Sequence, residues 1–166
     1  MTINIGDKLP EATLFETTEF GEACPLNPKP VSTTEASAGK RIVLFALPGA
    51  YTPTCSAKHV PGYVANLDAF KGKKVDEIWC VSVNDGYVMA AWGKDQKAIG
   101  KIRMLGDGNA ELTTKLGLET DLTKSGMGVR SRRYSMLVDN GVVQRLNLEQ
   151  AGKFEVSNAE TMLAQL

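Results

Sequence analysis

The sequence has few cysteines and a single histidine, and this scarcity excludes several classes of site. Its 166 residues contain Cys24, Cys55 and Cys80, an odd number at wide spacing and without a Cys-x-x-Cys pair. Disulfide-held secreted domains need paired cysteines, and zinc sites need clusters of cysteine or histidine. We therefore expect neither structural disulfides nor a metal site, and a reducing, cytoplasmic setting.

An excess of one charge and long apolar runs are also absent. Nineteen Lys and Arg balance nineteen Asp and Glu, so no net charge favours nucleic acid or an anionic membrane as a partner. No apolar run approaches the ~20 residues of a membrane span, and residues 1–7 lack the pattern of a secretory signal. The sequence therefore predicts no nucleic-acid partner and no membrane partner.

What is present fits one ordinary globular domain. Hydrophobic residues make up 43% and charged residues 23% of the chain, which suits a single domain over residues 1–166 with a substantial core. Apolar and amphipathic segments alternate along it. Strands are predicted at 41–47, 75–83 and 102–105, and helices at 53–70, 87–98 and 110–116. A hairpin is predicted at 132–138 and 142–148 around Asn140-Gly141. The Ser157-x-x-Glu160 capping box is expected to open a final helix.

Other segments give weaker signals. Residues 9–17 suit an edge strand or a hairpin arm, residues 22–37 are expected to be irregular because prolines recur there, and residues 119–129 are expected to form a loop. Pro61 falls inside the first long helix and predicts a kink or a local break. The overall order indicates an α/β fold with a thioredoxin-like mixed sheet flanked by helices.

The turn after the first predicted strand carries the main candidate site. Pro48 and Gly49 end the strand, and Thr52 and Pro53 suit the N-cap and the first position of a helix. Cys55 then lies in the first turn, beside backbone N–H groups that lack intrahelical partners. Open α/β sheets usually place their sites at such a turn.

A first-turn position alone does not make a cysteine reactive. A free thiol is only a few per cent ionised at neutral pH, and stabilising the thiolate enough takes about 2 kcal/mol. A helix N-terminus contributes about 0.3–1 kcal/mol, so the chain must provide a cation from elsewhere. Strand alternation places Arg133 on one face with Leu137 and makes it the candidate. Arg130 and Arg132 are interpreted as a solvated basic loop. Without such a cation, Cys55 would be a small buried residue with no chemistry.

The segment from Pro48 to Ser56 reads PGAYTPTCS and resembles the active-site signature of the peroxiredoxins, Pro-x-x-x-Thr-x-x-Cys. His59 and Pro61-Gly62 after it, CVSVND at 80–85, WG at 92–93 and RYSM at 133–136 match the type II subfamily in order and spacing. The resemblance covers nearly the whole chain. It implies a thiol-specific peroxidase, reducing hydrogen peroxide and organic hydroperoxides without a metal, flavin or haem.

The resemblance also implies a role for each residue of the signature. Cys55 is the expected peroxidatic cysteine, which attacks the peroxide and becomes a sulfenic acid. The hydroxyl of Thr52 is expected to bond the attacking sulfur and the peroxide. Arg133 is expected to hold the thiolate and polarise the O–O bond, and Pro48 to shield the site from water.

The reductant and the assembly are further expectations from the resemblance. It implies an external thiol, with glutathione and glutaredoxin favoured and thioredoxin as the other reductant, and a homodimer with its interface near the site. Cys80 is a candidate resolving cysteine, because plant type II members carry a cysteine there, although its apolar strand suits simple packing. Cys24 is interpreted as an incidental loop thiol.

Two other function classes stay open. A thioredoxin-fold redox-sensing or binding module would oxidise at Cys55 without efficient turnover. A Cys-His hydrolase is less well supported, since His59 lies four residues from Cys55 on one helix and no separate orienting group is apparent.

Overall fold

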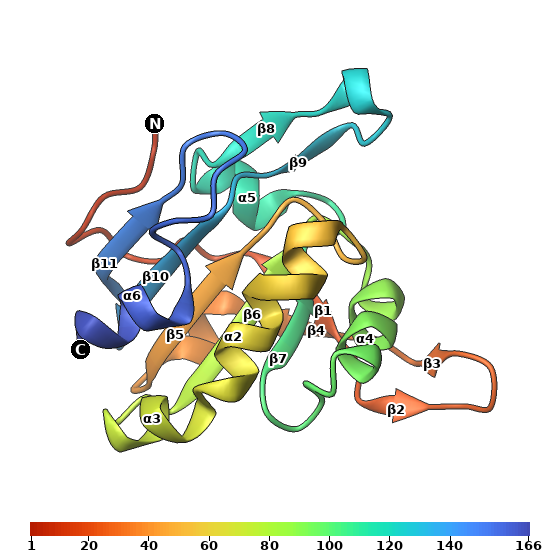
Figure 1. The fold of residues 1–166 in the computed structure, drawn as a ribbon, viewed down its shortest axis with the longest axis horizontal. Coiled ribbons are helices and arrows are strands. Elements are labelled where there is room, and N and C mark those ends of the chain that lie inside the picture. Colours follow the sequence, from red (N-terminus) through yellow and green to blue (C-terminus); the bar gives the residue numbers. More distant parts are fainter.

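The computed structural model describes all 166 residues, which form a seven-stranded mixed sheet covered by helices (Figure 1). The strand order is β11-β10-β5-β6-β7-β1-β4. The three central strands run parallel and their neighbours run antiparallel. The strands are β1 (Thr13–Glu16), β4 (Lys29–Ser32), β5 (Arg41–Ala46), β6 (Glu77–Ser82), β7 (Arg103–Gly106), β10 (Tyr134–Asp139) and β11 (Val142–Leu148).

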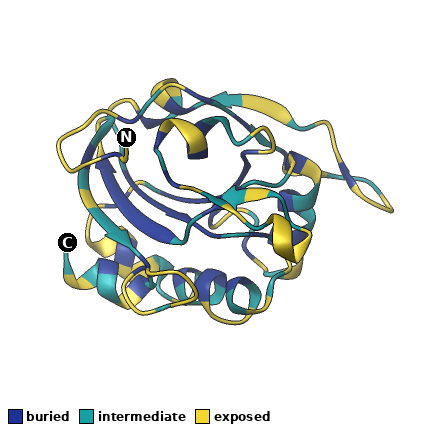
Figure 2. Cartoon of the chain, turned by 90° about the horizontal axis from the view of Figure 1, so that it is seen from above, coloured by how far each residue is buried: buried dark blue, intermediate teal, exposed yellow.

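Helices cover both faces of this sheet, so its central strands are buried between two layers (Figure 2). On one face lie α2 (Val60–Ala65), α3 (Leu67–Gly72), α4 (Gly86–Asp95) and α6 (Ala159–Ala164). On the other lie α5 (Glu111–Lys115) and the N-terminal segment. This arrangement is the α/β, thioredoxin-like fold that the sequence predicts.

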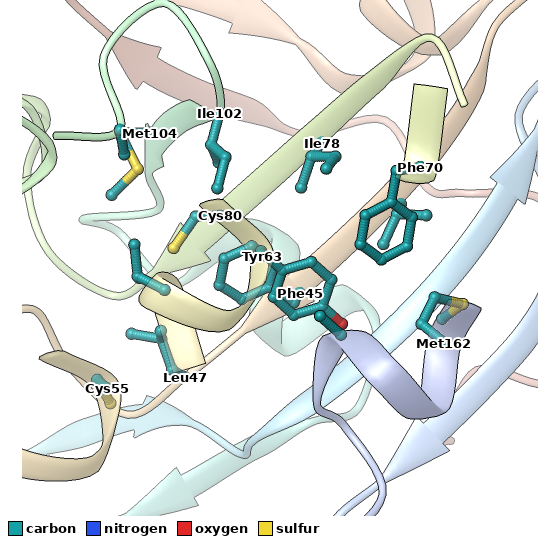
Figure 3. Packing of buried hydrophobic residues seen from close by; sticks show 14 of the residues in the cluster. Phe45, Leu47, Cys55, Tyr63, Phe70, Ile78, Cys80, Ile102, Met104 and Met162 are labelled. Carbon is teal, nitrogen blue, oxygen red and sulfur yellow. The ribbon is translucent and has the colours of Figure 1, made fainter. Parts of the chain in front are cut away.

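Alternation along the strands divides the core into two clusters. Val43 and Phe45 of β5 face the α2 side, whereas Ile42 and Leu44 face the α5 side. On the α2 side the Phe45 ring stacks on Tyr63 with centroids 4.1 Å apart. Cys55 and Cys80 belong to this same cluster (Figure 3). The candidate site therefore borders the largest aromatic contacts of the core.

The predicted hairpin around Asn140-Gly141 is confirmed, and the helix predicted at 110–116 has a cap at each end. Asn140 and Gly141 both adopt positive φ between β10 and β11, as a type I′ hairpin turn requires. The carboxylate of Asp107 accepts hydrogen bonds from the first backbone N–H groups of α5. Gly117 adopts φ +68° just after that helix.

The N-terminal region is more regular than the sequence predicts. Residues 22–37 contain β3 (Pro25–Leu26), which pairs with β2 (Glu19–Phe20), followed by β4 and α1 (Thr33–Ser37). Strand β4 takes the edge of the main sheet, so β1 is internal. Of the two alternatives predicted for residues 9–17, an edge strand or a hairpin arm, the edge strand is therefore wrong. Pro30 sits in β4 because an edge strand tolerates a residue without an N–H donor.

The helix that carries Cys55 is irregular just before Pro61, where the sequence predicts a kink or a local break. Residues Cys55–His59 form a π-helical turn, closed by a bond from the Val60 N–H to the Cys55 carbonyl, and α2 follows directly. Pro61 lies in the first turn of α2, where a missing N–H donor is tolerated. The helix breaks at Asn66, whose φ of −101° and ψ of 12° leave the helical region.

Two further predictions of local structure are corrected. Residues 119–129 are not simply a loop, because β8 (Glu119–Asp121) pairs with β9 (Val129–Ser131) around a 3₁₀ turn at Thr123–Ser125. The cap of α6 is Asn158, whose side chain accepts from the Thr161 N–H. The hydroxyl of Ser157 donates instead to Glu149.

None of the helices combines the length and the apolar character needed to cross a bilayer.

Gly106→Ala should destabilise the fold, because a Cβ there would lie 2.7 Å from the Asn84 carbonyl oxygen and 2.8 Å from two further backbone atoms. We expect a loss of about 1–3 kcal/mol in the free energy of unfolding, measured by chemical denaturation. Gly72→Ala is the matched control, since nothing lies within 4 Å of its added Cβ. Equal stability of the two variants would contradict the close approach at Gly106.

Candidate active site

Cys55 lies at the end of the loop that leaves β5. The side-chain oxygen of Asn84, from the loop after β6, accepts from the Ala50 N–H at 3.0 Å and from the Ser82 hydroxyl at 2.6 Å. Tyr51 adopts φ +61°, which turns the chain toward the helix. Cys55 then opens the π-helical turn and is fully buried. The neighbouring strand β6 therefore positions the loop that presents the thiol.

The guanidinium of Arg133 contacts the thiol. Its Nη2 donates to Cys55 Sγ at 3.3 Å, and its Nη1 bonds His59 Nδ1 at 2.9 Å. The guanidinium also lies over the Phe154 ring, 5.7 Å from its centroid. Arg133 forms no ion pair with any carboxylate. Its positive charge is therefore directed at the sulfur without competition from an anion.

His59 holds this arginine as a neutral acceptor. Its Nε2 bonds the Ser157 carbonyl oxygen at 3.1 Å, so Nε2 carries the proton and Nδ1 accepts from Arg133. Burial, and next the charge of Arg133, lower the pKa of His59 to about 3. The imidazole is therefore uncharged near neutral pH. Because Nδ1 is occupied by Arg133, His59 does not act on Cys55 as the base of a Cys-His hydrolase.

Thr52 and Pro48 lie on the same loop as Cys55. The Thr52 hydroxyl donates to the Gly49 carbonyl oxygen at 2.7 Å. It makes no hydrogen bond to Cys55 Sγ and accepts none from a helical N–H. The helix does begin at Pro53, as predicted, and the Thr52 carbonyl oxygen accepts from the Ser56 N–H at 3.0 Å, but the side chain provides no cap. The Pro48 carbonyl oxygen accepts from the Arg130 Nη1 at 3.2 Å. The structure thus brings Arg133 to Cys55 and places Pro48 beside Arg133 in one cavity, while Thr52 is held on the loop by Gly49. The catalytic roles of these residues stay predictions.

The sequence and the fold were compared with those of known proteins. The Redoxin family model matches residues 4–163. Peroxiredoxin-2E, chloroplastic, of Arabidopsis thaliana is 48% identical over 99% of this chain and 70% of its own length. Peroxiredoxin-2D of the same plant is 44% identical over 99% of this chain and 98% of its own. The crystal structure of reduced Prx3 in complex with H₂O₂ from Vibrio vulnificus is 51% identical, covers 99% of both chains and has a TM-score of 0.91.

The chain belongs to the peroxiredoxin family. It is a type II member and a thiol-dependent peroxidase. The resemblance read from the signature around Cys55 is therefore confirmed at the level of the family and the activity.

Arg130 contributes to this peroxiredoxin site in a way that the sequence reasoning missed. Its Nε donates to the Met127 carbonyl oxygen at 2.9 Å, and its Nη1 reaches Pro48. A Cβ at Gly49 would lie 2.7 Å from that Nη1. The interpretation of Arg130 as a solvated residue is wrong, because it ties the β8–β9 hairpin to the loop before Cys55.

Glu149 is the second residue that was missed. The residue is only 4% exposed. Its carboxylate accepts four hydrogen bonds at 2.8–2.9 Å, from the backbone N–H groups of Glu155, Val156 and Ser157 and from the Ser157 hydroxyl. Burial alone would raise the pKa of Glu149, but these bonds, led by those from Ser157, lower it overall. The Ser157 carbonyl oxygen in turn bonds His59 and Tyr63. The buried carboxylate of Glu149 thus orders the loop at 155–157, and this loop holds His59, which in turn bonds Arg133.

The other two cysteines lie apart from these contacts. All three cysteines are free. Cys80 is fully buried in β6, and burial raises its pKa well above the ordinary value. Figure 3 shows Cys80 between Met104 and Tyr63, with Cys55 at the edge of the cluster. Cys24 is exposed.

Arg133→Met should slow alkylation of Cys55 at pH 7 by two or more orders of magnitude. The substitution removes the cation that lies 3.3 Å from the sulfur but keeps much of the apolar stem. Arg145→Met is the control, because Arg145 is exposed on β11 and bonds only the Gln144 carbonyl oxygen through its side chain. Similar alkylation rates for the two variants would show that Arg133 does not stabilise the thiolate.

Glu149→Gln should destabilise the protein at neutral pH by about 1.5–3 kcal/mol, since it weakens hydrogen bonds to a buried charged group. The pKa of Glu149 is lowered on folding. Its contribution is therefore complete above about pH 4.3, the ordinary carboxyl value, and is lost as the pH falls through the lower folded value. Denaturant titrations at several pH values measure this. Glu155→Gln, on the exposed part of the same loop, should show little change, and a loss for Glu149→Gln that persists at low pH would contradict the charge effect.

Proposed function

We propose that this peroxiredoxin reduces hydrogen peroxide and organic hydroperoxides at Cys55, and that Arg133 activates both the thiol and the peroxide. The observation that carries the proposal is the 3.3 Å contact from an arginine without a carboxylate partner to a buried sulfur. In a buried site, water screens such a charge weakly, so preorganised donors stabilise developing negative charge effectively.

The chemical step follows from these groups. The Cys55 thiolate attacks the terminal peroxide oxygen, an S–O bond forms and the O–O bond breaks. Sulfur is oxidised to the sulfenic acid while the peroxide is reduced. The second oxygen leaves with the electron pair of the O–O bond and takes a proton from solvent to become water or an alcohol. The Arg133 guanidinium stabilises the charge that moves from sulfur onto the oxygens.

Thr52 and Pro48 fit the same step. The Thr52 hydroxyl gives its proton to the Gly49 carbonyl oxygen, so its lone pairs remain free to accept a hydrogen bond from the peroxide O–H. This bond would hold the terminal oxygen in line with the sulfur. Pro48 has no N–H donor and its ring would limit the access of water to Cys55. Since Cys55 is fully buried, small peroxides are the favoured substrates.

An external thiol is the proposed reductant of the sulfenic acid, with glutathione and glutaredoxin favoured over thioredoxin. A Cys55–Cys80 disulfide would require the two Cα atoms to lie within about 7 Å, and Cys80 would have to leave a strand in which it is fully buried. Cys80 is therefore at most an auxiliary partner. The homodimer stays a prediction.

The proposal is tested by peroxide consumption with dithiothreitol as the reductant, followed by intact-mass and peptide mapping. Cys55→Ser should abolish turnover and Cys24→Ser should leave it intact. Mapping after one equivalent of peroxide should place the added oxygen on Cys55. Turnover by Cys55→Ser would overturn the assignment of the nucleophile. A stoichiometric Cys55–Cys80 bridge with loss of turnover in Cys80→Ser would overturn resolution by an external thiol.

Thr52→Val should react slowly with peroxide in a folded protein, because it keeps the volume of the side chain and removes the oxygen that accepts from the peroxide. A hydrogen bond to a charged group, or to a group on which charge develops, is worth about 1.5–3 kcal/mol, so the rate should fall about 10- to 100-fold. Thr52→Ser should retain much of the rate. Stopped-flow measurement of the first turnover compares them, and equal rates for valine and serine would leave the hydroxyl only its bond to Gly49.

A further inference from the structure

A cavity of about 220 Å³ opens beside Arg133, on the side of the β8–β9 hairpin and residues 149–153. Four separate segments line it: the loop before Cys55, the β8–β9 hairpin, the link between β9 and β10, and residues 149–153. Only two of its twelve lining residues are hydrophobic. The other lining residues offer backbone or side-chain polar groups, so a hydrophilic molecule would find several polar partners here.

The cavity carries an excess of positive charge. Arg132, Arg133 and Lys153 line it, against a single carboxylate from Glu149. That carboxylate is already bonded to the backbone and the hydroxyl of residues 155–157. Neither arginine forms an ion pair. The side chain of Arg132 only donates to the Glu149 carbonyl oxygen, at 3.3 Å.

The third cation is also largely available. Lys153 lies 3.8 Å from the carboxylate of Glu155, but half of the Lys153 side chain and two thirds of the Glu155 side chain are exposed. Such surface pairs are worth little, so an incoming anion can compete for the lysine. The net field in the cavity therefore favours an anionic occupant.

The cavity is linked to the reacting sulfur through Arg133, although Cys55 itself does not line it. Arg133 both lines it and donates to Cys55 Sγ, and Thr54, the residue before Cys55, also lines it. A molecule anchored here would contact Arg133, which separates it from Cys55. Because Cys55 itself is fully buried, direct contact with its sulfur requires the first turn of the helix to open while the anchor holds the molecule in place.

We propose that Arg132 and Lys153 form a subsite for the carboxylate of a small thiol, which reduces the sulfenic acid of Cys55. This inference rests on the function proposed above and adds the residues that bind and select the thiol. The thiol sulfur attacks the Cys55 sulfur, an S–S bond forms and the S–O bond breaks. The oxygen leaves as water with the proton of the sulfenic acid and the proton of the thiol. A second thiol then attacks the mixed disulfide and releases Cys55.

The test isolates this reduction step. Protein is first oxidised with one equivalent of hydrogen peroxide and checked by mass, and then mixed with glutathione or with glutathione diethyl ester, which lacks free carboxylates. Tryptophan fluorescence and quenched-flow mass analysis give the rate. We expect glutathione to react about five- to tenfold faster than the ester, and sodium chloride to reduce that preference.

Substitution of the subsite should remove the preference. In Arg132→Gln and in Lys153→Gln, the rate with glutathione should fall toward the rate with the ester, while the rate with the ester should stay the same. Lys124→Gln is the matched control, because Lys124 is exposed on the β8–β9 hairpin and does not line the cavity. Lys153 is itself exposed, so its variant should fold even if Arg132→Gln does not.

Three outcomes would count against a proposal, and they are distinguishable. If peroxide does not oxidise Cys55, the proposed function fails. If Cys55 is oxidised but glutathione and its ester reduce every variant alike, the subsite fails.

A carboxylate-bearing hydroperoxide and its methyl ester are compared in the oxidation step. A dependence on Arg132 and Lys153 in that step alone would show that the cavity binds the oxidising substrate, which would overturn its assignment to the reductant.

Discussion

The site depends on one physical constraint, an arginine whose charge is left unneutralised next to a buried sulfur. Every close partner of the Arg133 guanidinium is uncharged or is the reacting thiol itself: the imidazole of His59, the ring of Phe154 and Cys55 Sγ. A carboxylate at any of these positions would compete with the thiolate for the same cation. Burial that keeps His59 neutral, with its pKa lowered to about 3, is therefore part of how Cys55 is activated.

The sheet sets the distance between the arginine and the cysteine. Strand β10 pairs with β5 so that Tyr134 lies opposite Ala46, which puts Arg133 directly beside the loop that leads to Cys55. A slip of one residue in this register would turn Arg133 to the α5 side of the sheet. The antiparallel pairing of β10 with both β5 and β11 protects against such a slip. The chemistry at the loop thus depends on strand register in the core.

Sequence reasoning recovered the features that are encoded locally. The buried strands, the Asn140-Gly141 hairpin and the position of Cys55 each follow from a short pattern, and the resemblance to a known signature then linked Cys55 with Arg133. It missed Arg130 and Glu149, because their partners lie on segments that only tertiary structure brings near. It also missed the edge strand β4, since Pro30 was read only as a sign of irregular structure. The π-helical turn at Cys55–His59 was missed as well, because no local pattern in those five residues distinguishes it from an α-helix.

Glu149 shows how a buried anion can remain next to a positively charged cavity without cancelling its charge. Its carboxylate is aimed at three backbone N–H groups and the hydroxyl of Ser157, so its lone pairs are occupied by neutral donors and not by arginine. The same carboxylate fixes the carbonyl of Ser157, which sets the tautomer of His59 and therefore the orientation of Arg133. Replacing Glu149 by an apolar residue would leave these N–H donors buried without acceptors, and the loop that lines the cavity would lose its order together with the support of the arginine. One carboxylate thus couples the chemistry at Cys55 to the shape of the cavity beside it.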